Sequence, residues 1–228
     1  MKKYLPTIIV GAAVAIIIGF VIWAASSPKN DGSQQSTQST ETDQDSSAAT
    51  EEQQKALKTG WSRGNDQAKV VVTEFGDFQC PACARISPQI NEQLLPKYGD
   101  KILFVFKNFP LEMHKNSWPA AQAAEAAGAQ GQYWPMHDLI YEKQNEWSES
   151  ASPNDKFIAY AQELGLNVDK FRSDIEAKRF KDRIQADLDL GKSLNIPGTP
   201  SFYVNGQPVD LQSGIKDIES AIDKALGQ

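Results

Sequence analysis

Both cysteines of this 228-residue chain stand in the stretch "TEFGDFQCPACARISP", Thr73 to Pro88, with two residues between them. A pair of this form, here Cys80 and Cys83, can bind a metal ion, close a structural disulfide or exchange electrons. The position of the pair and the other ligands in the chain help to distinguish the three.

A metal site and a structural disulfide both have weak support. The chain holds two histidines, and His114 and His137 stand far apart, whereas zinc sites of this composition space their histidines about three to five residues apart. A disulfide across so short a loop restricts the unfolded chain little. We therefore expect electron exchange, with no metal and no cofactor.

The surroundings of Cys80 favour a reactive thiolate. Pro81 suits the first position of a helix, because its missing N–H has no partner to lose there. Cys80 would then lie at the helix N-terminus, where unpaired amides and the helix dipole stabilise an anion and lower a thiol pKa to roughly 3.5–7.5. Cys83 lies one turn further on the same face, close enough to attack a mixed disulfide. We expect Cys80 to be the nucleophile and Cys83 the resolving thiol.

The elements around the pair predict a β-α-β unit. The run "KVVVTEF" before the cysteines is typical of a strand buried on both faces. Apolar residues at helical spacing follow as far as Leu94, the glycine of "YGDK" ends that helix, and "KILFVFKNFP" predicts a second, parallel strand. A block of helices follows. Asn205-Gly206 then predicts a hairpin whose second strand, with Pro208, lies at the sheet edge, before a last helix.

The N-terminal part predicts a membrane anchor and a tether. Leu5 to Ala25 carries no charge over 21 residues, about the length that crosses a bilayer, and Lys2 and Lys3 before it place the N-terminus in the cytoplasm. A cleaved signal peptide stays an alternative. We assign residues 1–27 to a single-pass anchor, 28–60 to a polar, disordered linker and 61–228 to an extracytoplasmic domain. The net charge of −6, without a basic stripe, argues against nucleic acid.

The motifs "CPAC" and "GTPSFYVNG", with the predicted order of elements, resemble the DsbA-like branch of the thioredoxin superfamily. The resemblance implies an α/β thioredoxin fold with a helical insertion at about residues 112–195. It also implies a cis peptide bond before Pro200, with Thr199 and Pro200 forming a groove for the partner's backbone beside Cys80. We expect Pro81 and Ala82 to add to substrate binding.

Further positions match the same family. Glu74 stands where the family has a buried acid six residues before the nucleophile; burial would raise its pKa, and it could carry protons for Cys83. Pro88 matches a proline that kinks the active-site helix. We interpret Lys107 and His114 as surface residues and His137 as structural.

The leading hypothesis is an extracytoplasmic oxidoreductase that forms disulfide bonds in exported proteins and acts as a monomer. The resemblance implies reoxidation by a quinone-linked membrane protein of the DsbB or vitamin K epoxide reductase-like type. A reductase or isomerase with the same cysteines, and a non-catalytic binding module, are the alternatives. The reduction potential that would decide the direction cannot be read from the residues.

Overall fold

The computed structural model describes residues 49–227. The predicted anchor and most of the predicted linker lie outside this range. Within it, no helix combines the length and the apolar character needed to cross a membrane.

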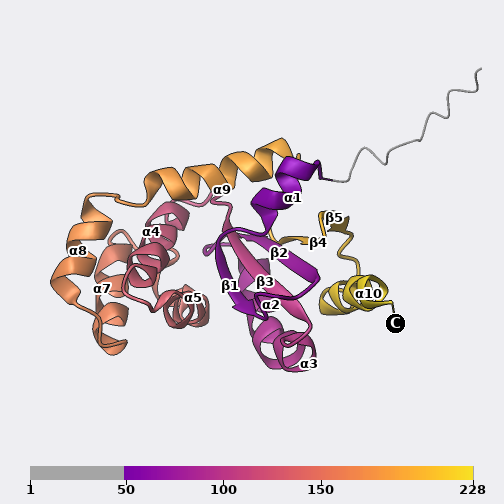
Figure 1. Cartoon of the computed structure of the whole chain (residues 1–228). Coiled ribbons are helices and arrows are strands. Elements are labelled where there is room, and N and C mark those ends of the chain that lie inside the picture. Colours follow the sequence, from indigo (N-terminus) through magenta and orange to yellow (C-terminus); the bar gives the residue numbers. More distant parts are fainter. Residues whose placement is uncertain (1–48, 228) are drawn as a thin grey trace, which may run out of the picture. The chain divides into compact units, whose positions relative to one another are not determined.

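A five-stranded mixed sheet forms the centre of the domain (Figure 1). Its spatial order is β1 (Trp61–Gly64), β3 (Ile102–Asn108), β2 (Val70–Gly76), β4 (Ser201–Val204) and β5 (Gln207–Val209). β2 and β3 run parallel, as the crossover pattern predicts, and the other pairs are antiparallel. Every residue of β2 is buried, because both faces of a sheet built on a β-α-β unit are covered by helices.

One face of the sheet is covered by the helix that begins after Cys80 and by the C-terminal helix. α2 (Pro81–Gln89) contains Pro88 and continues through a π-helical turn (Ile90–Leu94) into α3 (Leu95–Tyr98). α10 (Ile215–Leu226) lies beside them. Apolar side chains of these helices share one core with the strands, including Leu94, Phe104 and Ile218.

A block of helices is inserted between β3 and β4, as predicted. It consists of α4 (Ser117–Gly128), α5 (Tyr133–Glu142), α6 (Gln144–Trp147), α7 (Pro153–Glu163), α8 (Val168–Glu176) and α9 (Lys181–Ser193). Its core includes the fully buried Trp147, Phe157 and Phe171. α9 runs from this block back along the sheet toward α1 (Figure 1).

The predicted end of the disordered linker at residue 60 needs correction. α1 (Glu51–Leu57) lies inside the predicted linker and belongs to the folded domain. Thr50 and Gln53 close a capping box at its start, which satisfies backbone N–H groups that would otherwise lack partners. Leu57, at 2% exposed, is the buried residue of this helix and packs in a core with Phe75 and Tyr203, so it holds a largely polar helix against the sheet.

Candidate active site

The two cysteines lie where β2 leads into α2. Cys80 is the N-cap residue of α2 and Pro81 occupies its first turn, as the sequence predicts. Both cysteines are free thiols; Cys80 is 6% exposed and Cys83 is fully buried. Pro81 is exposed and Ala82 half-buried, so the residues between the cysteines are accessible to a bound polypeptide.

The segment before β4 faces Cys80. The peptide bond between Thr199 and Pro200 is cis, as the family resemblance implies. The sulfur of Cys80 lies 3.3 Å from the Thr199 carbonyl oxygen. The structure therefore brings Thr199 beside Cys80, although the two stand 119 positions apart in the chain.

The two thiols have opposite acidities. A hydrogen bond from the Cys83 thiol is the largest cause that lowers the pKa of Cys80, to about 5; Thr199 and the N–H groups of Ala82 and Cys83 add to it, while burial opposes it. Burial, followed by the hydrogen bond to Cys80, raises the pKa of Cys83 well above its ordinary value. Near neutral pH, Cys80 is a thiolate and Cys83 a thiol, which suits the predicted roles of nucleophile and resolving thiol.

Glu74 is buried in β2, with 1% of its surface exposed. Burial raises its pKa to about 8; the nearby charge of Arg63 opposes this shift and that of Cys80 adds to it. Among the described residues, its Oε1 atom has no hydrogen-bond partner. Glu74 is therefore protonated at neutral pH. When it ionises, its carboxylate raises the pKa of Cys83, so the two groups are coupled, as a proton carrier for that thiol would require.

Lys107 was predicted to be exposed, and this prediction is wrong. Its side chain is 6% exposed, and its ammonium lies 2.9 Å from Oδ1 of Asp187 on α9. The other carboxylate oxygen of Asp187 accepts from the N–H of Asn108 at 3.1 Å. The sequence gives no sign of this partner, because it stands eighty positions later. The pair joins β3 to the helical insertion.

The sequence interpretation missed Asp77, which organises the turn before Cys80. Its side chain is fully buried. Four groups bond to it: the N–H of Gln79 at 2.7 Å, the N–H of Leu111 at 2.9 Å, the ring of His114 at 2.7 Å, and the hydroxyl of Ser117. The carboxylate thus ties the active-site turn to the start of the helical insertion, and His114 serves this contact instead of lying free at the surface.

His137 is structural, as predicted. It is 4% exposed, and its ring packs against Phe106 and Tyr141 with centroids 4.8 and 5.0 Å away. Burial lowers its pKa, so the ring is neutral at physiological pH.

Comparisons with known proteins point to one family. A thioredoxin family model matches residues 55–224. The probable disulfide bond formation protein D of Bacillus anthracis is 30% identical over 227 residues, covering 96% of this chain and 94% of that protein. The crystal structure of oxidised BdbD from Bacillus subtilis is 27% identical, with a TM-score of 0.62, over 73% of this chain and 92% of that one.

A second group of relatives is much longer than this chain. A Na(+)/H(+) antiporter NhaA 1 of Salinispora arenicola is 38% identical over 165 residues, which are 72% of this chain. The chain spans about a quarter of that protein, 24% of its length.

Proposed function

The chain belongs to the DsbA-like branch of the thioredoxin family, and we propose that it is a thiol:disulfide oxidoreductase that forms disulfide bonds in reduced, exported polypeptides. The acidity of Cys80 is the observation that carries the proposal. A pKa of about 5 stabilises the reduced form of the pair, and pairs with a stabilised reduced form are oxidants.

The reaction would begin with a disulfide between Cys80 and Cys83. A substrate thiolate attacks the sulfur of Cys80, which forms a mixed disulfide and releases Cys83 as a thiolate. That thiolate takes a proton, and Glu74, which is coupled to it, is the candidate donor. A second substrate thiolate then attacks the substrate sulfur of the mixed disulfide. This step forms the substrate disulfide and releases Cys80 as a thiolate, so two electrons pass from the substrate to the cysteine pair.

The groove for the substrate would be formed by Thr199 and Pro200 facing Cys80, with Pro81 and Ala82 at its accessible side. The reduced pair needs an acceptor for its two electrons. We expect a quinone-linked membrane protein of the DsbB or vitamin K epoxide reductase-like type, because an apolar run from Leu5 to Ala25 would hold the domain at a membrane. These proposals about location and partner rest on the sequence.

The test is to incubate the oxidised full-length chain with a reduced, unfolded protein that contains two cysteines and to follow formation of its disulfide. We expect one disulfide per oxidised chain, and no product with the Cys80→Ala variant. The Cys83→Ala variant cannot form the starting disulfide and should also give no product. When its Cys80 thiolate is mixed instead with a substrate that already carries a disulfide, it should form a mixed disulfide, release one substrate thiol and accumulate in that state, because it has no second cysteine to resolve the mixed disulfide.

Equilibration with glutathione buffers separates an oxidase from a reductase. We expect a reduction potential well above that of thioredoxin, about −270 mV. A potential at or below that value, together with rapid reduction of insulin, would assign the reductase function instead. Full activity of Cys80→Ala in both assays would exclude the redox function and leave a binding module.

A further inference from the structure

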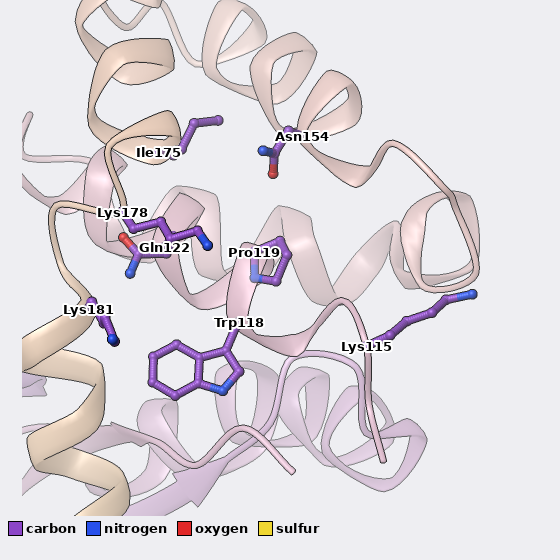
Figure 2. Close-up of a pocket in the computed structure, with 8 residues that line it drawn as sticks. All are labelled: Lys115, Trp118, Pro119, Gln122, Asn154, Ile175, Lys178 and Lys181. Carbon is purple, nitrogen blue, oxygen red and sulfur yellow. The ribbon is translucent and has the colours of Figure 1, made fainter. Parts of the chain in front are cut away.

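A cavity of about 390 Å³ opens in the helical insertion, and neither Cys80 nor Cys83 is among the residues that line it. It lies between α4, the start of α7 and the α8–α9 connection (Figure 2). Its volume falls in the range of about 300–1,000 Å³ typical of ligand pockets. Neither the fold nor the thiol chemistry described above requires it.

The lining of the cavity is apolar with a cationic side. Trp118, Pro119 and Ile175 supply the apolar surface, and Lys178 and Lys181 the charges. Within residues 49–227, neither of these two ammonium groups forms an ion pair with a carboxylate. An unneutralised pair of cations beside an apolar surface favours an amphipathic anion.

Lys115 also lines the cavity but is placed differently. It pairs with Glu149 at 3.1 Å, and its ammonium points away from the other lining side chains (Figure 2). We therefore do not expect the ammonium group of Lys115 to contact the ligand.

Two buried polar atoms of the lining lack partners within the described part of the chain. Gln122 is 4% exposed; its Oε1 atom accepts from the N–H of Phe180 at 3.1 Å, while its Nε2 atom has no acceptor. Oδ1 of Asn154 is buried and has no donor. Buried polar groups are nearly always hydrogen-bonded, so the cavity presents one unused donor and one unused acceptor to whatever fills it.

Lys178 has a backbone conformation that lysine rarely adopts. It follows α8 with φ of 50°, in the left-handed region where glycine or asparagine usually closes a helix. A lysine at this position costs stability relative to glycine. Replacing Lys178 by glycine therefore removes the charge while favouring the same backbone conformation.

We propose that this cavity binds the C-terminal end of an apolar polypeptide. The terminal carboxylate would be held by Lys178, Lys181 and Gln122 Nε2, a backbone N–H would donate to Asn154 Oδ1, and the apolar side chains would pack on Trp118. This ligand supplies an acceptor, a donor, a negative charge and an apolar surface together. The inference rests on the proposed function only in taking the peptide to be a client; binding itself needs no cysteine.

Isothermal titration calorimetry on the full-length chain in detergent tests the proposal. Cys80 and Cys83 are both replaced by alanine, so that no thiol exchange contributes to the heat. The probes are N-acetyl-phenylalanyl-leucine with a free carboxylate and the same peptide as its C-terminal amide. We expect the acid to bind with a Kd below about 1 mM and at least about tenfold more tightly than the amide.

Lysine variants complete the test. Lys178→Gly and Lys181→Ala should each weaken binding of the acid at least about threefold and leave the affinity for the amide unchanged. The unfolding midpoint of Lys178→Gly should stay the same or rise. Lys216→Ala, at an exposed position on α10, is the matched control and should change nothing.

Equal affinity for acid and amide, absence of binding by both, or unchanged binding by the lysine variants would overturn the proposal. Because the cysteines are absent from this experiment, its result is independent of the disulfide assays. Peptide binding by a chain that fails those assays would refute the redox function alone.

Discussion

The thiol of Cys80 and the carboxyl of Glu74 lie at the same site but have opposite shifts in acidity. Cys80 has helix N–H groups and the Cys83 thiol around it, which favour its anion, whereas Glu74 lies in a strand with every neighbour in that strand buried. A stabilised thiolate and a neutral acid can therefore coexist at neutral pH, a combination that suits thiol exchange with proton transfer.

The first prediction concerns the acidity of Cys80. Its rate of alkylation by iodoacetamide should rise with pH through a midpoint near 5 and stay constant through neutral pH, because the thiolate is the reactive form. In Cys83→Ala the midpoint should move upward, since the largest stabilising hydrogen bond is lost. A midpoint of Cys80 near the ordinary thiol value, about 8.5, would contradict the proposed leaving-group role.

The second prediction concerns Glu74. Its folded pKa is about 8, raised from 4.5, so the native state binds more protons than the unfolded state between these values. The stability contributed by this group is present at low pH and falls as pH rises toward 8. Glu74→Gln should therefore gain unfolding free energy relative to the parent chain as pH rises from 5 to 8.

Urea unfolding of the oxidised proteins at the two pH values measures this gain. Glu142→Gln, at an exposed position, is the control and should show no such trend. A parallel pH dependence of the parent and Glu74→Gln would mean that Glu74 is not buried as a neutral acid.

At the scale of elements, the sequence predicted what periodicity and turn chemistry specify. The β-α-β unit, the hairpin at Asn205-Gly206 and the helical insertion follow from local patterns. α1 and β1 were missed because α1 is polar apart from Ala56 and Leu57 and β1 has four residues. The partners of Asp77 and Lys107 could not be predicted, because a single charged residue has no spacing that identifies a distant contact.

The next prediction concerns the stability that the ion pair between Lys107 and Asp187 gives to the contact of β3 with α9. Lys107→Met should lower the unfolding free energy by about 3–5 kcal/mol, because it leaves the Asp187 carboxylate buried without its cation. Lys143→Met removes the cation of a more exposed pair, with Glu163 at 2.8 Å, and should cost much less, because water screens an exposed ion pair. Equal losses in urea unfolding would mean that burial does not strengthen the first pair.

A further prediction concerns α1. Leu57→Ala should lower the unfolding free energy by about 2–5 kcal/mol, as expected for a leucine that is 2% exposed, while the alkylation rate of Cys80 stays unchanged. Denaturant unfolding and alkylation of the same samples give both quantities. No loss of stability would mean that the folded domain begins after α1, as the sequence interpretation placed it.

At the scale of the whole molecule, the redox pair is part of the main core. Cys83 and Phe78 belong to the same apolar cluster as Phe106 of the sheet and Trp147 and Phe157 of the helical insertion. A change in the charge of the pair therefore acts on the packing between the sheet and the insertion, and the redox state should be visible in global stability.

The last prediction is that the reduced chain is more stable than the oxidised chain at neutral pH, by an amount that depends on pH. The folded pKa of Cys80, about 5, lies below its unfolded value of 9.0, so the reduced form gains stability as pH rises from 5 toward 9 and loses it as pH falls through 5.

The slope of this stability difference is at most about 1.4 kcal/mol per pH unit. Both forms carry the Glu74→Gln substitution in this comparison, because the charge of Cys80 also raises the pKa of Glu74. The oxidised form has no thiol to titrate, so the difference between the two forms reports Cys80. Urea unfolding of both forms between pH 5 and pH 8 measures it, and a difference that stays constant or shrinks with rising pH would show that the thiolate does not stabilise the reduced protein.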